Sequence, residues 1–168
     1  MRGLEPADIA EIVCEVGEGT VHRLWEPLSD KQRPPNGYAG KFATPYCIAT
    51  ALVRGSLGLD AFTDEAVADP AVRALAVNIR YEVDPANPYP RAFTGHIRAT
   101  LRDGRSLEER QPHMRGGAHA PLTRAEIEAK LAGNARSGGW TQAQIDAAHT
   151  LAKSIWHAAH IDLADLRG

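Results

Sequence analysis

The sequence predicts an α+β domain in which a mainly antiparallel sheet of about four strands packs against helices. Three observations support this class. Apolar and polar residues alternate in several short runs, as they do in half-buried strands. Helix-start signals lie between the first two of these runs and again after the last one. Asp103-Gly104 joins two of the runs, and this dipeptide is a strong hairpin signal because its turn needs positive φ angles.

The alternating runs define four strands. Ile9–Val16 is rich in β-branched residues and ends at a glycine, and Ile79–Val83 alternates until a proline follows. Phe93–Leu101 places Ile97, Ala99 and Leu101 on one face, which favours a half-buried strand. The returning strand, Ser106–His113, is more polar and is expected nearer an edge.

Between the first two strands the sequence predicts one long loop and three helices. Glu26–Gly40 contains three prolines and little apolar periodicity, so we expect a loop there. Thr44 and Pro45 then form a helix start, with the threonine as cap, and the apolar residues that follow predict a buried helix. Two more capping signals predict short helices over residues 64–68 and 70–77.

Two capping boxes predict the helices near the C-terminus. In each box a threonine and a glutamate or glutamine three residues later satisfy each other's backbone donors. Thr123 opens a helix over Arg124–Arg136, which ends at two glycines, and Thr141 opens the last helix. With 168 residues, the chain has the usual length of one domain, and we assign residues 1–168 to a single domain.

Composition excludes several classes of protein. A net charge of -2 without a basic block argues against a nucleic-acid-binding protein. The longest apolar stretch is too short to cross a membrane, and the N-terminus lacks the apolar region of a signal peptide, so we expect a soluble, cytoplasmic protein. Cys14 and Cys47 suit buried thiols in a reducing compartment, and two cysteines cannot form a structural zinc site.

The histidines do not predict a metal site. His157 and His160 share a helix face, but without a third ligand a solvated helix end is the better interpretation. The spacing of His22, His96, His113 and His119 suggests no partner for any of them. We therefore expect neither a bound metal nor a cofactor.

The segment before the apolar helix is the candidate site. Tyr38 and Lys41 lie in the predicted loop, and Tyr46 lies in the first turn of the helix. A helix N-terminus favours anions, so a lysine and two tyrosines beside it could bind and protonate a carboxylate. The alternative is that the tyrosines pack in the core and that Lys41 is solvated surface.

Several spaced motifs resemble the C-terminal half of the MmgE/PrpD family, which includes 2-methylcitrate dehydratase and cis-aconitate decarboxylase. The likeness covers nearly the whole chain and keeps the family's order. It rests on Leu24-Trp25-Glu26-Pro27, Arg33-Pro34, Tyr38 to Ala49, Gly58 to Thr63, Asp69 to Arg73, Thr100 to Arg105, Arg115-Gly116, Pro121-Leu122-Thr123, Glu126 and Lys130-Leu131.

The resemblance implies a function as well as a fold. Family members are metal-independent, act on small di- and tricarboxylates, are usually homodimers, and place the active site between a helical domain and an α+β lid. Tyr46 matches a lid tyrosine that faces the pocket, which implies a catalytic role. Lys41 matches a position that is often basic in the family. We assign Lys41 and Tyr38 to substrate binding. The chemistry is proton abstraction beside a carboxylate, followed by loss of water or carbon dioxide.

The resemblance also implies that the chain is incomplete as an enzyme. The family's catalytic base lies in the helical domain, which we expect this chain to lack. We therefore expect the lid of a lyase that needs a helical-domain partner, or forms a homo-oligomer, to act. The alternative is a non-catalytic remnant, or an interaction module that uses the old interdomain face to bind another protein.

Overall fold

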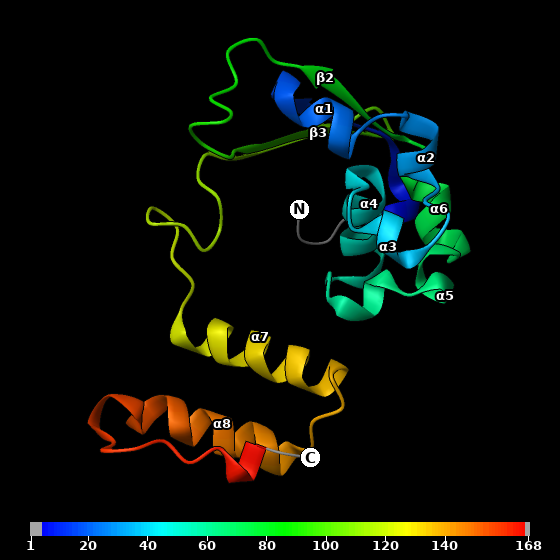
Figure 1. Ribbon diagram of the computed structural model, residues 1–168. Helices are drawn as coiled ribbons and strands as arrows, with labels where there is room; N and C mark the ends of the chain where they lie inside the picture. The colour runs from blue at the N-terminus through cyan, green and yellow to red at the C-terminus, as the bar shows by residue number, and fades with distance from the viewer. Residues whose placement is uncertain (1–4, 167–168) are drawn as a thin grey trace. The chain divides into compact units, whose positions relative to one another are not determined.

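The computed structural model describes residues 5–166, which fall into two compact units divided between Pro121 and Leu122. Unit 1 contains the sheet and six α-helices, and unit 2 contains α7, α8 and the C-terminal turns (Figure 1). Residues 1–4, on which part of the signal-peptide expectation rests, lie outside the described residues. The assignment of the whole chain to one domain stays a prediction.

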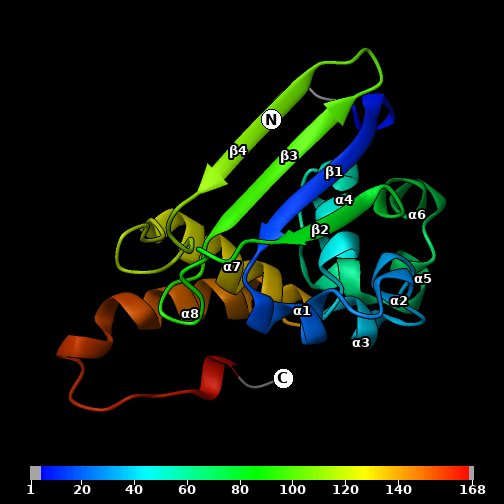
Figure 2. The same cartoon turned by 90° about the horizontal axis from the view of Figure 1, so that it is seen from above.

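Unit 1 is built on a four-stranded mixed sheet, which confirms the α+β class. The strands lie in the order β2-β1-β3-β4, side by side in Figure 2. The β1–β2 pair is parallel, whereas β1–β3 and β3–β4 are antiparallel, so the sheet is not purely antiparallel. Their bounds are Ile9–Val16 (β1), Ile79–Val83 (β2), Gly95–Leu101 (β3) and Ser106–Gln111 (β4).

A helical crossover joins the parallel strands β1 and β2, as a parallel connection requires. It contains α1 (Glu18–Leu24), α2 (Leu28–Gln32), α3 (Gly37–Gly40), α4 (Thr44–Arg54), α5 (Asp64–Val67) and α6 (Pro70–Ala76), with a 3-10 turn at Leu59–Phe62 before α5. Another 3-10 turn, Pro6–Asp8, lies outside the crossover and precedes β1. The two short helices and the apolar helix were predicted. The helix α1 was not.

The prediction of a continuous loop over Glu26–Gly40 is wrong, because α2 and α3 lie within it. Pro27 directly precedes α2 as its N-cap, so this proline marks a helix start rather than a break. Asn36 caps α3, since its side chain accepts a hydrogen bond from the Ala39 N–H. Neither helix is long enough to show apolar periodicity.

The hydrophobic core lies between the sheet and the crossover helices, with α4 and α6 close to the sheet in Figure 1. Alternate strand residues contribute to it: Ile12 and Cys14 from β1, Ile79 from β2, and Ala99 and Leu101 from β3. Alternate residues on the opposite face of the sheet are polar, apart from Val13. This alternation explains why β1 and β2 were predicted with their exact bounds.

Unit 2 contains two helices opened by the predicted capping boxes, and both boxes are present. The helix α7 spans Arg124–Ser137 and α8 spans Gln142–Ser154, followed by 3-10 turns at Ile155–His157 and Ala164–Leu166. No helix in residues 5–166 is both long and apolar enough to span a lipid bilayer.

Candidate functional site

Tyr46 lies in the first turn of α4, but its side chain belongs to the core. The residue is 0% exposed, and its hydroxyl donates a hydrogen bond to the Ala61 carbonyl at 2.5 Å. Its ring also meets Phe62 edge-on, with the centroids 6.4 Å apart. The helix starts as predicted at Thr44, but Ala43 is its N-cap and no side chain caps it, so the predicted threonine cap is wrong. The catalytic role of Tyr46 stays a prediction.

Tyr38 and Lys41 are brought together at the surface around α3. The Lys41 Nζ lies 5.9 Å from the Tyr38 ring centroid, and the Tyr38 ring is 72% exposed. The rings of Phe42 and Tyr38 meet edge-on, with their centroids 5.5 Å apart. The Arg23 guanidinium lies over the Phe42 ring, 5.2 Å from its centroid. Two cations and two aromatic rings thus form one exposed cluster, a suitable surface for an anion.

Sequence reasoning missed Arg23 as a member of this cluster. It lies on α1, a helix that the sequence did not predict, and it reaches the cluster only through Phe42. The local signal is a lysine between two aromatic residues over positions 38–42, and it points to Lys41 alone. Tyr46 is 0% exposed, whereas Tyr38 is 72% exposed.

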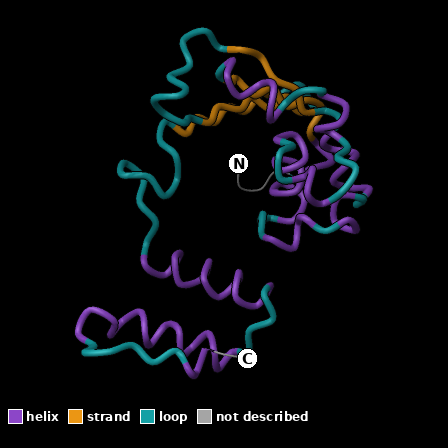
Figure 3. The backbone as a smooth tube through the Cα atoms, in the orientation of Figure 1, coloured by secondary structure: helices purple, strands orange, loops and turns teal. Residues whose placement is uncertain are grey.

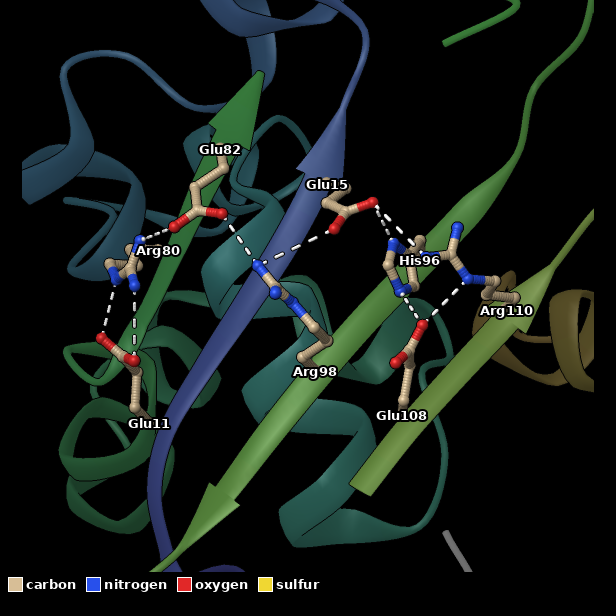
Figure 4. Close-up of polar contacts among 8 residues, drawn as sticks. All are labelled: Glu11, Glu15, Arg80, Glu82, His96, Arg98, Glu108 and Arg110. Carbon is tan, nitrogen blue, oxygen red and sulfur yellow. Dashed lines mark hydrogen bonds and ion pairs between the residues drawn. The ribbon is translucent and has the colours of Figure 1, made fainter. Parts of the chain in front are cut away.

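The face of the sheet opposite the core carries a network of ion pairs centred on His96 (Figure 4). The His96 Nδ1 lies 2.5 Å from Glu15 Oε2, and its Nε2 lies 2.8 Å from Glu108 Oε1. The Arg110 Nε donates a hydrogen bond to the same Glu108 oxygen at 2.9 Å. Because both ring nitrogens already contact carboxylates, neither is open to a substrate or a metal. It links β1, β3 and β4.

Arg80 and Arg98 extend this network across the sheet. Arg80 pairs with Glu11 at 2.7 Å and with Glu82 at 2.7 Å, and Arg98 pairs with Glu82 at 2.8 Å. The pKa of the Glu82 carboxyl is lowered, mainly by its hydrogen bond from Arg80. The pKa of the Glu108 carboxyl is also lowered, mainly by its hydrogen bond with His96 and next by the one from Arg110. The network thus joins four glutamates to three arginines and His96 across the sheet.

Acid should weaken unit 1, because Glu82 and Glu108 bind protons more readily in the unfolded chain than in the folded one. Their contribution is fully present above the ordinary glutamate pKa of 4.5 and is lost as the pH falls through the lower folded values. We expect a constant urea midpoint from neutral pH to about pH 5 and a decline below it. The replacement Glu82→Gln should flatten that decline. Glu109→Gln should leave it unchanged, because Glu109 makes no ion pair with any residue between 5 and 166.

Neither cysteine has the environment of a nucleophile. Burial raises the pKa of Cys14 to about 12 and that of Cys47 to about 11. Both thiols are free and stay protonated near neutral pH. Nucleophilic thiol chemistry therefore has no support at these two positions.

An apolar cavity of about 220 Å³ lies where β1 ends and β3 begins. Its wall includes Val16, Trp25, Ile48, Tyr89 and Phe93. Tyr38, Lys41 and Tyr46 do not line it, and its mostly apolar wall suits a charged carboxylate poorly. The candidate site is therefore the Arg23–Tyr38–Lys41–Phe42 cluster beside the start of α4.

Comparison with known proteins gives a family match over residues 2–153, to the MmgE/PrpD C-terminal domain. The chain is 29% identical to cis-aconitate decarboxylase of Mus musculus over 137 residues, which are 80% of this chain and 26% of that protein. It is 30% identical to the mitochondrial 2-methylcitrate dehydratase of Yarrowia lipolytica over 109 residues, 61% of this chain and 20% of that protein. The chain thus spans about a quarter or less of these relatives' lengths. The match covers nearly all of the chain, which belongs to the MmgE/PrpD family and corresponds to its C-terminal domain.

Proposed function

We propose that this chain is the C-terminal lid of a lyase that acts on small di- or tricarboxylates. The family match over residues 2–153 carries the proposal, and the two relatives named above are a decarboxylase and a dehydratase. The reaction is metal-independent. In dehydration a base removes a proton beside a carboxylate, and the leaving hydroxyl takes a proton from an acid and departs as water. In decarboxylation the carbon–carboxylate bond breaks to release carbon dioxide, and an acid protonates the carbon that keeps the electron pair. The base comes from a helical-domain partner, and the complex acts in the cytoplasm.

The exposed cation cluster supports a binding role for this chain. Arg23 and Lys41 present positive charge beside Tyr38, and α4 begins nearby with no side-chain cap. In the proposed enzyme Lys41 and Tyr38 bind a substrate carboxylate, while Tyr46 supplies a proton. Because the Tyr46 hydroxyl is bonded to Ala61, that role requires the hydroxyl to leave its carbonyl partner when the lid meets the helical domain.

An activity assay of the reconstituted enzyme tests the proposal. The chain alone and the chain mixed with a helical-domain half are each given 2-methylcitrate, citrate and cis-aconitate, and product formation is followed by absorbance and carbon dioxide release. We expect turnover only in the mixture. Turnover by the chain alone would show that the base lies in this chain.

The second candidate function is a non-catalytic interaction module, and exposed apolar side chains in unit 2 favour it. Ile127 is 55% exposed and Trp156 is 88% exposed, which is typical of surfaces that associate. Stable binding of the helical half without turnover of any of the three substrates would select this function and reject the lyase.

A further inference from the structure

The loop that follows β4 places two histidines side by side. The imidazole rings of His113 and His119 have centroids 4.8 Å apart and planes inclined by 36°. The loop is the teal segment between β4 and α7 in Figure 3. Five residues separate the two histidines, so their proximity depends on how this loop folds.

Backbone hydrogen bonds within the loop hold it in this shape. The Gly116 N–H donates to the Ala120 carbonyl at 2.7 Å, and the Gly117 N–H donates to the Met114 carbonyl at 3.0 Å. Gly116 has a φ of +92°, a conformation that residues with a Cβ rarely adopt. These bonds hold the loop backbone in the shape that brings the two histidines together, so binding a ligand orders less backbone.

Both imidazoles are available as ligands. His113 and His119 are exposed, and within residues 5–166 neither ring makes a hydrogen bond or an ion pair. They differ in this from His96, whose two nitrogens are both occupied. Exposed histidine rings also turn readily about their last torsion, so either nitrogen can face the neighbouring ring.

The separation of the two ring centres is one that two histidines bound to the same metal ion can have. A ring centre lies about 3.2 Å from a metal bound at the usual metal–nitrogen distance of about 2.1 Å. Two such rings with centres 4.8 Å apart subtend an angle of about 97° at the metal. This angle lies between the square-planar and the tetrahedral values that divalent copper and zinc prefer.

We propose that His113 and His119 form a two-imidazole site for a borderline divalent transition metal, with Cu²⁺ bound most tightly. No group of three or more His, Cys, Asp or Glu side chains in residues 5–166 is arranged for a metal, so water completes the coordination. The site shares no residue with the cluster around Lys41, and the proposal is independent of the proposed lyase function.

Titration of the untagged full chain with Cu²⁺, followed by NMR of the histidine ring protons, tests the site. Paramagnetic broadening should reach His113 and His119 first, at substoichiometric metal. His113→Gln and His119→Gln should each weaken binding at least about tenfold, because each removes the advantage of two linked ligands. Gly116→Ala should also weaken it while keeping both imidazoles, because alanine does not tolerate that φ.

The pair His157 and His160 supplies the matched control. Both are exposed and three residues apart, and among the described residues the structure shows no ring contact between them. His157→Gln with His160→Gln should leave the affinity for Cu²⁺ unchanged. Equal broadening of all the exposed histidines, or unchanged affinity in the His113→Gln/His119→Gln double variant, would overturn the proposal.

Discussion

Gly37→Ala should destabilise unit 1 by about 3 kcal/mol, an upper value for overpacking a tight site. A Cβ at this position would lie 2.0 Å from the Phe62 carbonyl oxygen and 2.5 Å from its carbon. Both atoms belong to the backbone, so no side chain can rotate away to make room. The Gly37 N–H also donates to Asp64 at 2.9 Å, and the shift that relieves the clash would strain this bond. Urea unfolding followed by circular dichroism measures the loss.

Gly133→Ala is the matched control for this experiment. Gly133 lies inside α7, and a Cβ there would meet nothing within 4 Å. Alanine should stabilise that helix by about 0.5–1 kcal/mol, since it loses less backbone entropy on folding than glycine. An unfolding midpoint of Gly37→Ala equal to that of the parent chain would show that α3 and the turn at Phe62 can separate at little cost.

Tyr46→Phe should have two separable effects. The change leaves the buried Ala61 carbonyl without its donor, which should lower the free energy of unfolding by about 1–3 kcal/mol. In the reconstituted enzyme the loss of the proton donor should also lower kcat by about a hundredfold. Urea unfolding measures the first effect, and turnover at a temperature where the variant is folded measures the second.

Tyr89→Phe controls for removing a tyrosine hydroxyl. In the described chain the Tyr89 hydroxyl makes no hydrogen bond, and its ring packs edge-on against Phe93 at 5.4 Å. Stability and turnover should therefore stay near those of the parent. If Tyr46→Phe loses stability but keeps the parent kcat, the hydroxyl acts only in the core, and Tyr46 leaves the proposed site.

Local patterns predicted the elements that local interactions determine. The strands β1 and β2 were predicted to the residue because each alternates against a single core. Both capping boxes were predicted because two residues three positions apart define each of them. The helices α2 and α3 were missed because short helices beside prolines show no periodicity. The parallel pairing of β1 with β2 depends on long-range contacts that no local pattern contains.

In the candidate site, too, the sequence predicted local neighbours but not contacts that depend on the fold. Tyr38 and Lys41 are three residues apart, so sequence alone could place them together. Arg23 joins them only through the packing of α1 against Phe42, and His113 meets His119 only through the fold of a loop. Burial of the Tyr46 hydroxyl against Ala61 likewise depends on how the segment after α4 returns over that helix.

The parallel pair β1–β2 also constrains the order in which the chain can fold. The first strand, β1, has two neighbours in the sheet, and these begin only at Ile79 and Gly95. During synthesis β1 thus leaves the ribosome long before either partner, with its apolar face uncovered until the crossover is complete. Pairing strands so far apart in the sequence is slow, because closing a long loop costs conformational entropy. The sheet therefore forms late, and until then the unpaired β1 exposes the nascent chain to aggregation.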